Sequence, residues 1–96
     1  MKLVMLIADT AYATEVEQLL EECGVPGFTE IPNVLGKGAT GKKFGSRAFP
    51  GSSTMYLAAL DEHCMAPLQE KLKVLRDTHG PEGGLKAYTM NTEELL

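Results

Sequence analysis

Residues 36–53 of the chain read GKGATGKKFGSRAFPGSS and separate two halves of similar pattern. This stretch holds five of the ten glycines and four of the nine basic residues, and it contains no acidic residue. Its formal charge is +4, whereas the rest of the chain carries −8. Structureless inserts of this length are uncommon in a small domain, and they are usually functional or disordered. Glycine lets backbone amides approach an anion closely, so the stretch predicts an anion-binding or partner-docking loop. The alternative is a flexible solvated loop.

The first half predicts a strand, a helix and a second strand. Residues Leu3–Ala8 form a continuous apolar run that suits a strand buried on both faces. Thr14 and Glu17 have the spacing of a capping box, so we expect Thr14 to open a helix that ends at Gly24. Residues 28–35 are then β-like, and the proline among them favours an edge strand or a bulge.

The second half repeats this order. An apolar strand is expected at residues 54–60, and the amphipathic helix that follows has its proline in the first turn. The apolar positions of this helix are Met65, Leu68, Leu72 and Leu75. The sequence HGPEGG at residues 79–84 ends the helix, and residues 85–90 alternate as a last strand. The complete order predicts an α+β, ferredoxin-like βαββαβ fold in one domain spanning residues 1–96.

Size and composition restrict the classes of function. In a domain of this size, helices on one face of a four-stranded sheet leave the other face uncovered, so we expect a homo-oligomer packed through its sheets. The net charge of −4 argues against a nucleic-acid-binding protein, because such proteins carry a basic face. The apolar run at the start is too short for a signal peptide or a membrane span, which predicts a cytoplasmic protein.

The segment from Gly36 to Lys43 nearly matches the phosphate-binding loop of nucleotide triphosphatases. Lys43 stands where a Ser or Thr hydroxyl should hold magnesium, and the glycines and proline that follow forbid the required helix. A nucleotide-hydrolysing enzyme is therefore the lesser hypothesis, and no catalytic set of residues is found. Repeated glycines beside lysines can still form backbone concavities that hold an anion.

The order of the motifs resembles that of the PII signal-transduction proteins, and most closely their PII-like branch. The motifs are GVPGFTE at residues 24–30, GKG at 36–38 and GGLK at 83–86. The resemblance implies a homotrimer with an adenine nucleotide (AMP, ADP or ATP) as a small anionic effector in each cleft between subunits. It makes residues 36–53 the T-loop and residues 83–86 the B-loop of that family. The residues that it assigns to the nucleotide are Thr29, Gly36, Lys37, Gly38, Thr40, Gly83, Gly84 and Lys86.

The resemblance also implies a non-enzymatic regulator whose T-loop controls a partner protein, with a membrane transporter as the first candidate. We expect the loop to be mobile until it binds, with aromatic side chains filling pockets and basic ones pairing with an acidic rim. The expected partner-binding residues are Lys42, Lys43, Phe44, Arg47 and Phe49. Thr40 replaces a glutamine that helps related proteins hold magnesium and 2-oxoglutarate, so sensing of that metabolite is not expected. The loop has no tyrosine to be uridylylated.

A metal-binding trimer of the CutA type is the alternative function. His63, Cys64 and Met65 are adjacent soft or borderline ligands that copper or zinc could use. Adjacent residues of a helix do not face one point, so a helix start with a buried Met65 is the simpler interpretation. Cys23 and Cys64 lie far apart in sequence without a Cys-x-x-Cys spacing, which indicates neither a zinc knuckle nor a disulfide scaffold.

Overall fold

The computed structural model describes residues 1–38, 41–43, 45, 51–80 and 84–96. Its strands are β1 (Lys2–Asp9), β2 (Thr29–Val34), β3 (Gly36–Gly38), β4 (Gly41–Lys43), β5 (Ser53–Leu60) and β6 (Lys86–Asn91). Its α-helices are α1 (Ala13–Glu22) and α2 (Met65–His79), preceded by the 3-10 helices η1 (Thr10–Tyr12) and η2 (Glu62–Cys64). In the described part of the chain, no helix has the length and apolar character needed to cross a membrane.

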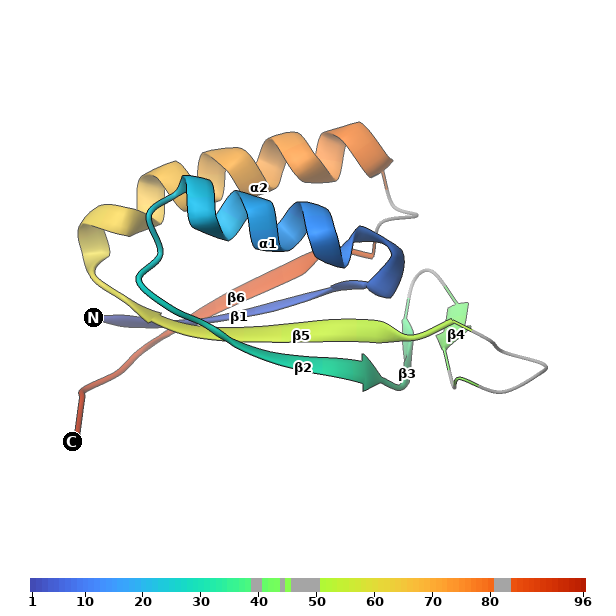
Figure 1. The fold of residues 1–96 in the computed structure, drawn as a ribbon, viewed down its shortest axis with the longest axis horizontal. Coiled ribbons are helices and arrows are strands. Elements are labelled where there is room, and N and C mark those ends of the chain that lie inside the picture. Colours follow the sequence, from blue (N-terminus) through green and yellow to red (C-terminus); the bar gives the residue numbers. More distant parts are fainter. Residues whose placement is uncertain (39–40, 44, 46–50, 81–83) are drawn as a thin grey trace.

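The main sheet has the strand order β2-β5-β1-β6, and all three neighbouring pairs are antiparallel. Each half of the chain contributes one central strand and one edge strand. Figure 1 shows α1 and α2 together on one face of this sheet, which gives a two-layer α+β structure. The predicted ferredoxin-like fold is confirmed.

The hydrophobic core lies between the sheet and the two helices. Alternate residues of the central strands are buried, which is the period-2 pattern of strands with one face on a core. Helix α1 buries residues three and four positions apart, whereas α2 buries Leu68. The buried apolar residues are Val4, Leu6, Ala8, Val16, Leu19, Leu20, Tyr56, Ala58, Leu60 and Leu68.

The start of α1 differs from the prediction. The helix begins at Ala13, directly after η1, and its first turn has no side-chain cap, so the predicted capping box at Thr14 is wrong. The cap lies earlier, where the Asp9 carboxylate accepts a hydrogen bond from the Ala11 backbone N–H at the start of η1. The predicted stop is confirmed, because Gly24 follows the helix with φ +70° and donates its N–H to the Glu21 carbonyl.

Pro32 predicted that the second strand would be an edge strand or contain a bulge, and β2 shows both features. β2 is an edge strand paired only on its β5 side within the described sheet, and its register shifts between Ile31 and Val34. Pro32 lies inside this irregularity, where its missing N–H costs no ladder hydrogen bond. Asn33 has φ +57°, a conformation that asparagine tolerates better than most residues.

The face of the sheet opposite the helices is also apolar. Strand register places Ile31, Met55 and Ile7 in one row, and Leu57 and Met5 in the next. On β6, Tyr88 and Met90 extend this face and are 55% and 48% exposed. The central strands are thus apolar on both faces, as the sequence predicted, and within one chain the helices cover only one of them (Figure 1).

The base of the predicted T-loop is more regular than a structureless insert. Strands β3 and β4 pair antiparallel, with Lys37 opposite Lys42 and Gly38 opposite Gly41. This corrects the prediction for the described residues of the loop. The positions 39–40, 44 and 46–50 lie outside the described residues.

Candidate anion-binding site

The T-loop emerges from a closed base on the main sheet. Val34 at the end of β2 is paired with Ser53 at the start of β5, so the two ends of the insert are neighbours. Beyond this base, Gly36, Lys37 and Gly38 form β3, and Gly36 and Lys37 are exposed. Like charges placed directly opposite each other in a sheet destabilise it. The register of this ladder places two basic residues, Lys37 and Lys42, at paired positions.

A cluster of hydroxyl groups holds the return of the loop. The Thr10 hydroxyl lies 2.9 Å from the Ser52 hydroxyl and 3.1 Å from the Thr54 hydroxyl. The Thr10 N–H also donates to the Ser52 carbonyl at 3.1 Å. Sequence reasoning missed this anchor, because its three residues come from two separate segments and form no motif. It couples the loop to the junction between β1 and α1.

The second predicted segment, the B-loop, follows the end of α2. Gly80 caps the helix with φ 63° and ψ −162°, and its N–H donates to the Arg76 carbonyl. Gly84 also has a positive φ, of 58°, before Lys86 opens β6 as an exposed residue. Gly83 lies outside the described residues. The described glycines thus turn the chain sharply between α2 and β6.

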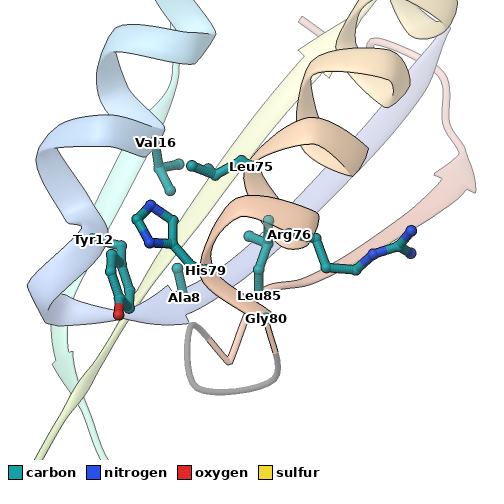
Figure 2. A pocket seen from close by; sticks show the side chains of 8 residues that line it. All are labelled: Ala8, Tyr12, Val16, Leu75, Arg76, His79, Gly80 and Leu85. Carbon is teal, nitrogen blue, oxygen red and sulfur yellow. The ribbon is translucent and has the colours of Figure 1, made fainter.

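The root of the B-loop is held by His79, the last residue of α2. Its ring stacks on Tyr12 with 4.2 Å between ring centroids, and its Nε2 lies 2.5 Å from the Glu15 carboxylate. These contacts connect the end of α2 to the start of α1, and Figure 2 shows Tyr12 and His79 beside each other. Sequence reasoning placed His79 at a helix end, but it gave no sign of either partner.

A small apolar pocket lies beside this contact, and Figure 2 shows its side chains. Its lining residues are Ala8, Tyr12, Val16, Leu75, Arg76, His79, Gly80 and Leu85. The cavity volume is about 10 Å³, close to the smallest space that holds one water molecule. This pocket therefore cannot accommodate a nucleotide.

The strands that adjoin the two predicted anion-binding segments, β2 before the T-loop and β6 after the B-loop, lie at opposite edges of the main sheet. Ile31 of β2 and Lys86 of β6 occupy the same row, with Met55 and Ile7 between them. Three interstrand spacings make this separation roughly 14 Å. Thr29 is likewise on β2, opposite Leu57 of β5. The strand that leads into the T-loop and the strand that follows the B-loop are therefore separated by the width of the main sheet.

Most of the predicted partner-binding residues, and Thr40, lie outside the part of the chain whose side chains the structure describes. Thr40, Phe44, Arg47 and Phe49 lie outside the described residues, and Lys42 and Lys43 are described only as backbone of β4. Their roles stay predictions.

The metal-binding alternative gains no support. His63 and Cys64 belong to η2, and Met65 begins α2. Across residues 1–38, 41–43, 45, 51–80 and 84–96, no group of three or more His, Cys, Asp or Glu side chains could hold a metal ion. Cys23 and Cys64 are free thiols packed against the core, and burial is the main cause that raises the pKa of the Cys23 thiol.

Comparisons with known proteins agree with the ferredoxin-like fold described above. A family model described as nitrogen regulatory protein P-II matches residues 1–94. The structure is similar to that of CPII, a nitrogen regulatory PII-like protein from Thiomonas intermedia K12, solved with bound ADP and bicarbonate. The two sequences are 26% identical, and the structures match with a TM-score of 0.74 over 97% of this chain and 88% of that chain. The same protein bound to ADP, AMP and bicarbonate matches with 25% identity and a TM-score of 0.72 over 96% and 93% of the two chains.

A more distant structure supports the fold alone. It is a putative PII-like signaling protein from Thermus thermophilus, with 18% identity and a TM-score of 0.69 over 95% of this chain and 85% of that one. No curated protein matches the chain significantly.

The turn after α2 generates a testable prediction. Gly80→Ala should lower the free energy of unfolding by about 1–3 kcal/mol, because its φ and ψ belong to a region that is essentially restricted to glycine. An added Cβ would meet no atom within 4 Å, so the loss would come from the backbone and not from a clash. Gly27→Ala is the matched control, since Gly27 has the same open space without a positive φ. Equal urea midpoints for the two variants would contradict this account.

Proposed function

The chain belongs to the nitrogen regulatory protein P-II family, and from this premise we propose that it is a non-enzymatic, homotrimeric signalling protein. It binds an adenine nucleotide between subunits and controls a partner protein through its T-loop. The observation that carries this proposal is the separation of Lys86 from the T-loop side of the sheet. Residues that lie at opposite edges of one sheet can surround one ligand when the edges of neighbouring subunits meet.

The assembly is supported by the uncovered face of the sheet. Burial of apolar surface is the dominant favourable term in stable association, and this face is apolar from Ile31 on β2 to Met90 on β6. Obligate interfaces are more hydrophobic than transient ones. A trimer held in this way should resist salt, because surface charges do not carry it.

The nucleotide site combines two segments from adjacent subunits. Lys86 and the backbone at Gly84 approach the phosphates from one side, and Gly36, Lys37 and Gly38 approach from the other. Thr29 lies toward the base. The similar CPII structures contain ADP, AMP and bicarbonate, which supports ADP or AMP as the effector and makes bicarbonate a second ligand to be tested.

The T-loop is the part that contacts the partner. The loop carries a formal charge of +4, whereas the rest of the chain carries −8, so the loop is a basic docking element on an acidic protein. The partner presents an acidic surface, with the cytoplasmic face of a membrane transporter as the first candidate. Because Gly36–Gly38 belong to both the phosphate site and the base of the loop, nucleotide can bias the loop through differential contacts there.

Assembly is tested by placing a charge at the centre of the apolar face. Leu57→Asp should convert the trimer to a monomer, because Leu57 lies between Met5 and Thr29 on that face and a carboxylate is costly to bury unpaired. Val74→Asp on the exposed surface of α2 is the matched control and should stay trimeric. Light scattering that gives a monomer mass for the wild-type protein at micromolar concentration would refute the assembly.

Nucleotide binding is tested by isothermal titration with AMP, ADP and ATP, each with and without bicarbonate. Lys86→Ala and Lys37→Ala should each weaken binding by roughly tenfold to over a hundredfold, the value of a charge-assisted hydrogen bond to phosphate. Lys73→Ala, which removes an exposed charge from α2, should bind like the wild type. If neither lysine at the site changes the affinity while all variants stay trimeric, the site is misplaced. Release of inorganic phosphate from ATP would instead support the hydrolase.

Partner control is tested by deletion of residues 41–50. The shortened protein should keep its trimer mass, since the paired ends of the loop at Val34 and Ser53 are retained, but it should no longer capture the partner. A full-length variant with Lys42, Lys43 and Arg47 changed to glutamate controls for loop length. Pull-down from native lysate is the measurement. Capture that persists in both variants would show that the body of the trimer makes the contact.

A further inference from the structure

The 3-10 helix η1 contacts the segments that adjoin both loops of the candidate site. Its first residue, Thr10, contacts the segment that returns from the T-loop. Its last residue, Tyr12, contacts the end of α2, which leads into the B-loop. Side chains two positions apart on a 3-10 helix project roughly 120° from each other. One turn of chain therefore reaches two segments that are distant in sequence.

Hydrogen bonds hold the T-loop end of η1. The Thr10 hydroxyl lies 2.9 Å from the Ser52 hydroxyl and 3.1 Å from the hydroxyl of Thr54, which is buried. The Thr10 N–H also donates to the Ser52 carbonyl at 3.1 Å. This last bond continues the ladder between β1 and β5, which pairs Asp9 with Ser53. A displacement of Thr10 would therefore act directly on the returning segment of the loop.

Packing holds the B-loop end of η1. The Tyr12 ring stacks on His79, and His79 Nε2 lies 2.5 Å from the Glu15 carboxylate. An ionised carboxylate only accepts hydrogen bonds, so Nε2 is the donor. Gly80 and Leu85, which flank the turn between α2 and β6, line the small pocket beside this stack (Figure 2). Both sides of the turn that contains the B-loop thus pack close to Tyr12.

η1 itself is fixed at each of its ends. The Asp9 carboxylate accepts a hydrogen bond from the Ala11 N–H at 3.0 Å and caps its start. The Ala13 carbonyl, directly after η1, accepts a hydrogen bond from the hydroxyl of the buried Tyr56 at 3.2 Å. Coupling between separated sites is carried by packed side chains and hydrogen-bond networks joined through rigid elements. η1 meets this description.

We propose that η1 is a mechanical link that couples the B-loop to the T-loop within one chain, with Tyr12 and Thr10 as its positioning residues. The route runs from the end of α2 through Tyr12 to Thr10, and from Thr10 to Ser52. Strand order explains why η1 can connect the two loops. It follows β1, a central strand that has β6 on one side and β5, followed by β2, on the other.

The role of this link in signalling rests on the function proposed above. Nucleotide phosphates that engage Lys86 also restrain the turn between α2 and β6, and η1 passes this restraint to Ser52. Gly36–Gly38 on the outgoing side of the T-loop respond to the nucleotide by direct contact. The two sides of the T-loop therefore respond by different routes. By reciprocity, a partner protein that fixes the returning segment tightens the binding of nucleotide.

The link is tested without ligand by amide hydrogen exchange at Thr10, whose N–H is bonded to Ser52. His79→Leu removes the stacked ring from the α2 side and should speed this exchange by roughly twofold to tenfold, the value of an aromatic pair. His79→Phe keeps a ring and should exchange more nearly like the wild type. Thr78→Val removes a hydroxyl hydrogen bond from the exposed side of α2 and should leave the exchange unchanged.

The amide of Leu6 is the internal reference, because this residue is paired on both sides within β1. A general loss of stability would speed exchange at Leu6 and Thr10 alike. Equal acceleration at the two amides in His79→Leu would overturn the link. Exchange at Thr10 that matches the wild type in His79→Leu would also overturn it.

The signalling role is tested by isothermal titration with ADP in a double-mutant cycle. Thr10→Val should weaken binding by about fivefold, near the lower end of typical coupling, and Thr10→Ser should restore it. In the His79→Leu background Thr10→Val should have no further effect, because the link is already cut. An equal loss in both backgrounds, or no loss in either, would overturn the role. If the wild type binds no ADP while the exchange result holds, the proposed function fails and the link stands.

Discussion

The apolar character of β1 and β5 on both faces is the constraint on which the rest of the structure depends. On one face their alternate residues pack under α1 and α2 and form the core. On the other face Met5, Ile7, Met55 and Leu57 form a second apolar surface that the chain cannot cover with its own helices. Folding of the subunit and its proposed assembly therefore draw on the same two strands, through opposite faces.

The division between central and edge strands organises the candidate site. The central strands hold the fold, while β2 and β6 at the edges lead into the T-loop and follow the B-loop. Segments with few packed neighbours open most easily, and such segments are the ones that binding can reposition. The closed base at Val34 and Ser53 lets the basic loop extend from the sheet without interrupting the core.

The start of α1 shows where local and tertiary preferences disagree. In the sequence, Thr14 and Glu17 match a capping box, which is a favourable local role. In the fold, α1 begins at Ala13 directly after η1, and the side-chain cap is provided by Asp9 at the start of η1. Tyr56 of β5 is buried against the same turn, where its hydroxyl donates a hydrogen bond to the Ala13 carbonyl.

The sequence by itself determined the order of the elements, because hydrophobic periodicity and glycine or proline breaks are local properties. The run Leu3–Ala8, the stop at Gly24 and the bulge at Pro32 were each readable from neighbouring residues. It also suggested Lys37, from its glycine-rich surroundings, and Lys86, through the resemblance to the PII proteins, as candidate anion-binding residues. Only the tertiary structure decided that Lys86 begins an edge strand at the opposite side of the main sheet from β2, that Thr10 holds Ser52, and that Tyr56 contacts Ala13. Each of these contacts joins segments distant in sequence, and strand order and register, which no local pattern encodes, bring them together.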